Sequence, residues 1–116
     1  MVNLALLYEE GDGVQENLER ALKLYERASE LGDSDALNNF GLMYEEGRGV
    51  EMDIHKAIEY YEKAVEQNNA ESMLNLGAIY EEGRGGVKVD LHKGFNYFYF
   101  FFFNLFIINL FILKKN

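Results

Sequence analysis

The sequence predicts an all-α fold, an α/α superhelical solenoid of about three antiparallel helix pairs followed by an apolar C-terminal helix. Three observations predict it: a motif that returns every 36 residues, two amphipathic helical patterns in each period, and residues suited to end a helix at regular positions. A fixed period of roughly 20 to 50 residues is typical of solenoids, because each unit buries its apolar face only against its neighbours.

The recurring motif reads tyrosine, two glutamates, glycine, one variable residue, glycine and valine. It occupies residues 8–14, 44–50 and 80–87, and the third copy has one inserted glycine. Three matches of this length indicate a repeat array over residues 1–98, divided into units of about 1–32, 33–68 and 69–98.

Each unit contains two helical patterns, here called helix A and helix B. Apolar or small residues recur at the i, i+3, i+4, i+7 spacing of an amphipathic helix. In the second unit the helix A stripe is Leu37, Phe40, Gly41 and Tyr44, and the helix B stripe is Ile54, Ala57, Ile58, Tyr61 and Ala64. We expect A helices near residues 2–10, 34–46 and 70–82, and B helices near 17–31, 53–67 and from 90 onward.

Short polar residues and glycines mark the expected helix ends. An Asp or Asn precedes each helix at the N-cap, where its side chain can accept a backbone N–H. These residues are Asn17, Asp33, Asp53, Asn69 and Asp90. At the C-terminal ends we expect a left-handed residue. The candidates are Gly11, Gly32, Gly47, Asn68 and Gly83.

Gly41 and Gly77 lie in the middle of A helices, where glycine costs about 1 kcal/mol relative to alanine. Both fall on the buried stripe, so we expect them to let helix B approach closely. Ala57 and Ala64 provide the small residues on the opposing helix.

The segment 36–44, followed by Gly47-x-Gly49-Val50, Asp53, Lys56-Ala57, Tyr60-Tyr61 and Lys63-Ala64, resembles a Sel1-like repeat almost position for position. The resemblance covers about residues 2–98, and its length and G-x-G-V turn separate it from the related tetratricopeptide repeat. The repeat signature comprises Gly41, Tyr44, Gly47, Gly49, Ala57, Tyr61, Ala64, Gly77, Tyr80, Gly83 and Gly85. The resemblance implies a protein-binding adaptor, in a family that includes subunits of endoplasmic-reticulum quality control and signalling scaffolds.

Composition argues against several other functions. The chain has no cysteine and a formal net charge of −9, with every carboxylate at or before Asp90, so thiol chemistry is excluded and a phosphate backbone would be repelled. The G-x-G turns follow two glutamates rather than a strand, which argues against a phosphate loop. His55 and His92 occupy equivalent positions on neighbouring helices, too far apart to share a metal ion. We therefore predict no catalytic residues, no cofactor and no metal site.

The outer face of helix A is the predicted partner surface. Asparagines and glutamates recur there every 36 residues, opposite the stripe that faces helix B. The two ladders are Asn3, Asn39 and Asn75, and Glu10, Glu46 and Glu82. Amides can bind an extended peptide backbone, and the glutamates favour a basic protein or peptide. Alternatively, the asparagines make local hydrogen bonds and the glutamates pair with Arg48 and Arg84.

Residues 99–116 depart from the repeat pattern. The stretch 95–113 has 19 residues without a charge, which is long enough to cross a bilayer as one helix. A membrane anchor and a soluble capping helix are two interpretations. A third is translated non-coding sequence, because residues 95–116 use only amino acids that AT-rich codons specify.

The leading hypothesis is a non-catalytic scaffold in the cytoplasm, since the N-terminus does not resemble a secretory signal. The alternatives are an adaptor tethered to the endoplasmic reticulum or another membrane, and, much less favoured, an enzyme. The sequence begins within a helix A and shows no polar capping repeat, which suggests a piece of a longer array. It does not indicate the partner, the pathway or the oligomeric state.

Overall fold

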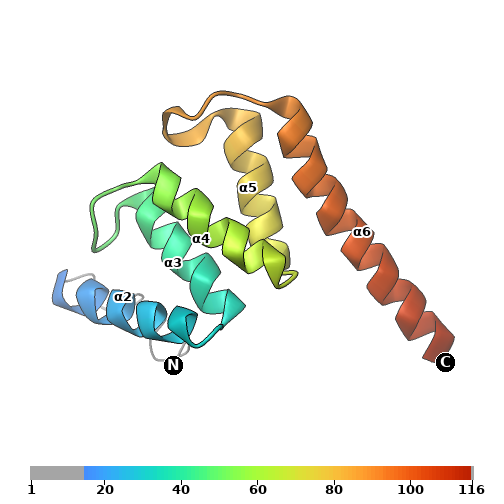
Figure 1. Ribbon diagram of the computed structural model, residues 1–116, viewed down its shortest axis with the longest axis horizontal. Helices are drawn as coiled ribbons and strands as arrows, with labels where there is room; N and C mark the ends of the chain where they lie inside the picture. The colour runs from blue at the N-terminus through green and yellow to red at the C-terminus, as the bar shows by residue number, and fades with distance from the viewer. Residues whose placement is uncertain (1–14, 116) are drawn as a thin grey trace. The chain divides into compact units, whose positions relative to one another are not determined.

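The computed structural model describes residues 15–115 of the chain, with side chains from residue 17 onward, and the regular secondary structure of this part consists of helices alone (Figure 1). It divides into two units, residues 1–69 and 70–116. The first contains α2 (Gln15–Glu30), α3 (Ser34–Glu46) and α4 (Ile54–Glu66). The second contains α5 (Ala70–Glu82), the short 3-10 helix η1 (Arg84–Gly86) and α6 (Leu91–Lys115). The expected all-α fold is confirmed, while the helix predicted near residues 2–10 lies outside the described residues.

Aspartates cap the N-termini of three helices, as the sequence predicts. The backbone N–H groups of Asp35 and Ala36 donate to Asp33 Oδ1 at 3.0 and 3.2 Å. Asp53 Oδ1 accepts the N–H groups of the second and third residues after it, both at 3.1 Å, and Asp90 Oδ1 accepts the Lys93 N–H at 3.0 Å. Each bond satisfies a backbone donor that the helix itself leaves free.

The predicted N-cap at Asn17 is wrong. Helix α2 already includes Gln15, so Asn17 lies inside its first turns. The residues before Asn17 are glutamine and glutamate, which are good helix formers, and they carry the helix past the expected start.

Four left-handed residues follow the long helices of both units at the predicted positions. Gly47 and Gly83 follow α3 and α5 with φ of 67° and 69°. Gly32 and Asn68 follow α2 and α4 with φ of 87° and 62°. The N–H of Arg48 then donates to Met43 O at 2.9 Å, the long-range bond of a Schellman ending.

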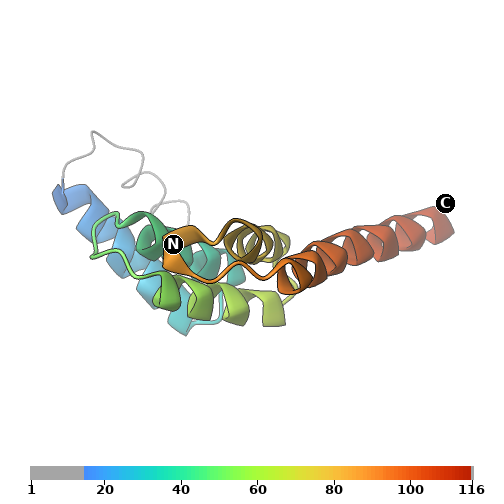
Figure 2. The same cartoon turned by 90° about the horizontal axis from the view of Figure 1, so that it is seen from above.

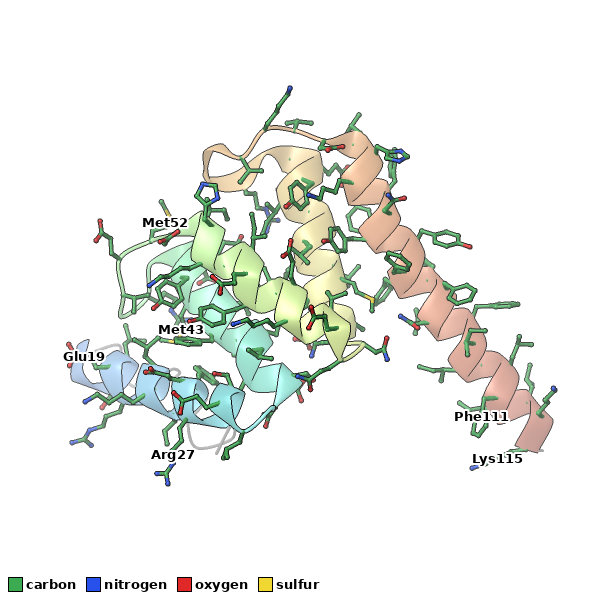
Figure 3. The ribbon with its side chains drawn as sticks, viewed as in Figure 1. Glu19, Arg27, Met43, Met52, Phe111 and Lys115 are labelled. Carbon is green, nitrogen blue, oxygen red and sulfur yellow. The ribbon has the colours of Figure 1, made fainter. Side chains whose placement is uncertain are left out.

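The core of the first unit joins α2 to α3. It consists of buried residues from both helices, namely Ala21, Tyr25, Ala28, Ala36, Phe40 and Met43. Met43 is fully buried, and Figure 3 shows its side chain where α2 and α3 meet. Small residues on α2 alternate with the large Tyr25, so the A helix of the second repeat packs closely on the B helix of the first.

Helices α3 and α4 approach closely at Gly41. A Cβ placed on Gly41 would lie 2.7 Å from Tyr61 Cε1 and 3.2 Å from the carbonyl oxygen of Ala57. Tyr61 is fully buried, and its hydroxyl donates to Glu45 Oε1 at 2.8 Å. The mid-helix glycine is therefore needed for the tyrosine ring to fit.

The second unit repeats this contact with a different ring. A Cβ on Gly77 would lie 2.5 Å from Phe98 Cε1, and one on Gly94 would lie 3.1 Å from the Gly77 carbonyl oxygen. The contact between α5 and α6 extends to Asn104, whose Nδ2 lies 3.6 Å from Met73 Sδ. Helix α6 then continues past the end of α5 without a break (Figures 1 and 2).

Candidate protein-binding surfaces

The predicted partner residues of the first unit lie on α3. Asn39 is half-buried and Glu46 is exposed near the C-terminal end of the helix. Glu46 Oε2 lies 3.9 Å from Arg48 Nη1, in an ion pair whose two side chains are both well exposed. Exposed pairs of this kind contribute about 0 to 1 kcal/mol, so Glu46 can exchange partners at little cost.

The second unit places the equivalent residues on α5. Asn75 is half-buried, Glu82 is exposed, and Glu82 Oε2 accepts a hydrogen bond from Arg84 Nε at 2.7 Å. The pairing of both glutamates with arginines matches the alternative interpretation of the sequence. Asn3 and Glu10 lie outside the described residues, so their place in the two ladders stays a prediction.

The turns after α3 and α5 form equivalent pockets in the two units. One has a volume of about 400 Å³ beside Tyr44 and Lys56, and the other about 650 Å³ beside Tyr80 and Lys93. The lysine Nζ lies 5.2 Å from the tyrosine ring centroid in the first and 4.7 Å in the second. In both, the N–H of the capping aspartate donates to the tyrosine carbonyl, at 2.9 and 2.8 Å. These contacts hold each turn against its helices, which explains why the motif tyrosine recurs.

A third pocket, of about 490 Å³, lies between α2, α3 and α4 of the first unit. We call it the α2–α4 pocket. Its lining includes the aromatic rings of Phe40 and Tyr60 and the carboxylates of Glu26, Glu30 and Glu66, with one lysine, Lys63. The sequence did not indicate this pocket, because residues from three helices form it and none of them stands out in a single helical pattern. The only sequence signal was the paired tyrosine at Tyr60 and Tyr61, of which one faces the core.

Burial shapes the chemistry of Tyr60. Burial raises the pKa of the Tyr60 phenol above its usual value, and the nearby phenol of Tyr44 and carboxylates of Glu59 and Glu26 raise it further. The Tyr60 ring lies 4.4 Å from that of Phe40 at a tilt of 33°, and it stacks with Tyr44 at 5.7 Å between centroids. The phenol is therefore neutral at physiological pH and presents an aromatic face beside several carboxylates.

Helix α6 is the one described helix long and apolar enough to cross a membrane. Its apolar stretch is exposed, with large side chains on every face beyond Asn104. Phe111 and Lys115 project from the end of this helix in Figure 3. Among residues 15–115 we find no group of three or more side chains arranged to hold a metal ion.

The chain consists of helix pairs that recur every 36 residues. Aspartates cap helices at their N-termini, left-handed glycines follow the described A helices, and each of these A helices packs closely on the next helix at a mid-helix glycine. These features define an α/α solenoid of the tetratricopeptide-like class. The chain belongs to the Sel1 repeat family, whose family model matches residues 1–33, 34–69 and 70–99. Proteins of this family are generally protein-interaction scaffolds.

Two solved structures share the fold. A Sel1 repeat protein from Oxalobacter formigenes is 33% identical over 84% of this chain, with a TM-score of 0.74. The protein c5321, a protective antigen of uropathogenic Escherichia coli strains displaying an SLR fold, is 30% identical over 85% of this chain, with a TM-score of 0.76. The chain spans 40% and 21% of the lengths of these two proteins. No curated protein matches it.

Proposed function

We propose that this chain is a non-catalytic scaffold that binds a protein or peptide along the outer face of its A helices. The observation that carries the proposal is the recurrence of the same polar pair on α3 and α5, Asn39 with Glu46 and Asn75 with Glu82. Both glutamates are exposed although each opposes the dipole of its own helix, at a cost of about 0.3 to 1 kcal/mol. A use in binding accounts for a position that helix stability alone disfavours.

The partner class follows from the charge of this face. Each glutamate pairs with an arginine in an exposed ion pair, and a partner's lysine or arginine can replace that arginine at little cost. The asparagine amides both donate and accept, which suits the backbone of an extended peptide. We therefore propose a basic peptide segment as the ligand of this face, in the cytoplasm.

A pull-down compares the wild-type full-length chain with the Asn39→Ala/Asn75→Ala double variant, using mass spectrometry to identify the bound proteins. We expect the double variant to recover none of the proteins that the wild type binds, while its helix content, measured by circular dichroism, is unchanged. Asn96→Ala is the matched control, because Asn96 is an exposed asparagine on α6 and outside the A helices. Equal recovery of partners by the wild type and the double variant would show that this face does not bind.

A second candidate function is membrane attachment through α6. The stretch between Lys93 and Lys114 contains 20 uncharged residues, which as a helix extend about 30 Å, the thickness of a bilayer core. Lysines flank it at both ends, where they can reach lipid headgroups. We propose that the repeat array comprises residues 1–98, and that 99–116 form a tail with this separate role.

The contacts of α6 with α5 limit how such an anchor works. Three residues of α6 contact α5, namely Gly94, Phe98 and Asn104. The part of the apolar stretch that lies beyond these contacts is therefore residues 105–113. Nine helical residues span about 14 Å, which is half of a bilayer core. A full crossing therefore requires α6 to separate from α5.

Carbonate extraction of membranes from cells expressing the tagged full-length chain tests this candidate. An anchored chain stays in the membrane pellet, and the Phe102→Glu/Phe106→Glu variant moves to the supernatant, because both rings are exposed on α6. If the wild type is extracted as completely as the variant, α6 is not an anchor.

A further inference from the structure

The α2–α4 pocket has an aromatic floor. Phe40 is buried, Tyr60 is half-buried, and their ring centroids lie 4.4 Å apart. Tyr44 completes a cluster of three rings, with its centroid 5.7 Å from that of Tyr60 and 5.3 Å from that of Phe40. A floor of this kind offers the face of a π-system, which attracts cations.

The rim of the pocket is acidic. Glu26 and Glu30 are contributed by α2 and Glu66 by α4, and all three are exposed. We find no ion pair for any of the three among residues 15–115. Lys63 is the single cation of the lining, so three carboxylates face one ammonium group.

Lys63 shows which kind of group the floor accepts. Its Nζ lies 5.5 Å from the centroid of the Tyr60 ring and 3.5 Å from Glu59 Oε1. A cation of the chain itself therefore already occupies the aromatic face, and its ion pair with Glu59 is an exposed i,i+4 pair that contributes little. This position is independent of the acidic rim and indicates the same ligand charge.

We propose that the α2–α4 pocket receives an arginine side chain of a protein partner, which displaces Lys63 from the Tyr60 ring. A guanidinium fits better than an ammonium, because its plane stacks on an aromatic ring while its five N–H groups reach carboxylates on both sides. The Tyr60 phenol is neutral at physiological pH, so its hydroxyl can also donate. The site rests on the proposed protein-binding function but lies apart from the face that carries Asn39 and Glu46.

NMR titration of the full chain in a non-ionic detergent tests the pocket with a small probe, Nα-acetyl-arginine N-methylamide. The matched probe is the citrulline analogue, which has nearly the same shape and no charge. We expect the arginine probe to shift the amide signals of pocket residues such as Ser29, Phe40 and Gln67. The citrulline probe should leave them unchanged. Equal shifts with both probes would overturn the proposal.

Three variants assign the binding to named groups. The affinity for the arginine probe should fall about tenfold in the triple variant Glu26→Gln/Glu30→Gln/Glu66→Gln. It should not change in Glu62→Gln, because Glu62 is an exposed carboxylate of α4 outside the pocket. Lys63→Gln should tighten binding about two- to fivefold, because the ring face is no longer occupied. Unchanged affinity in the triple variant, or weaker binding in Lys63→Gln, would refute the pocket.

The two proposals fail separately. Loss of the pocket in the triple variant leaves the outer face of α3 and α5 intact, so partners that need Asn39 and Asn75 should still be recovered in the pull-down. Retained arginine binding by Asn39→Ala/Asn75→Ala, measured with the same probe, would show that the pocket is independent of that face.

Discussion

Replacing Gly41 with alanine tests how the helices of the second repeat fit together. The new methyl group would lie 2.7 Å from Tyr61 Cε1, closer than Cβ atoms are found to other heavy atoms. The ring cannot move away easily, because Tyr61 is fully buried and its hydroxyl bonds to Glu45. The backbone oxygen of Ala57, at 3.2 Å, closes the other side.

The magnitude follows from two opposing effects. Overpacking a buried site costs about 1 to 3 kcal/mol, whereas alanine in place of a mid-helix glycine gains about 1 kcal/mol of helix propensity. A contact of 2.7 Å against a buried ring places the overpacking cost in the upper part of this range, about 2 to 3 kcal/mol, so the Gly41→Ala variant should lose roughly 1 to 2 kcal/mol of unfolding free energy after the gain in propensity. Urea denaturation followed by circular dichroism at 222 nm, a wavelength that reports helix content, measures this difference.

A double-mutant cycle identifies the ring as the cause. In the Tyr61→Leu background the ring is absent, so Gly41→Ala should cost much less or become stabilising. The reasoning is refuted if Gly41→Ala is as stable as the wild type, or if its cost is the same with and without the ring at residue 61.

Three further predictions concern single side chains. Tyr61→Phe should lower the unfolding free energy by about 1 to 2 kcal/mol in urea denaturation, because the bond to Glu45 is lost; equal stability would contradict a role for this hydroxyl. Asp53→Ala should cost about 1 kcal/mol by the same assay, whereas Asp53→Asn, which keeps a capping oxygen, should cost less. Since the folded state raises the Tyr60 pKa above 10.0, its contribution to stability is complete below pH 10 and is lost as the pH rises further, when the unfolded phenol ionises first. Tyr60→Phe should therefore lose less stability than the wild type as the pH rises above 10.0, and identical slopes would refute this.

The helix ends could be predicted from sequence because local chemistry decides them. Asp33 and Asp53 cap their helices through bonds to residues two and three positions away, so the sequence contains both partners. Gly47 adopts the left-handed conformation that few other residues tolerate. Asn17 was misplaced because its two predecessors favour a helix more strongly than an asparagine favours starting one.

Contacts between helices were harder to predict. The departure from the repeat pattern at Tyr99 did not indicate how far the contact between α5 and α6 extends: Phe101 is half-buried and Asn104 contacts Met73. A large ring can occupy the place of an alanine when the helices diverge, and a sequence pattern does not show their spacing. The α2–α4 pocket was missed for the same reason, since its rim and floor are assembled from three helices.

The central claim is that the chain binds a protein along the outer face of its A helices. A photo-crosslinking amino acid at Leu42, on α3 between Asn39 and Glu46, tests it directly without altering either residue. We predict a discrete covalent adduct in cells from position 42, absent when the same group replaces Glu62 on α4, and lost when Asn39 and Asn75 are both alanine. Equal adducts from positions 42 and 62, or an adduct that persists in the double variant, would contradict the claim.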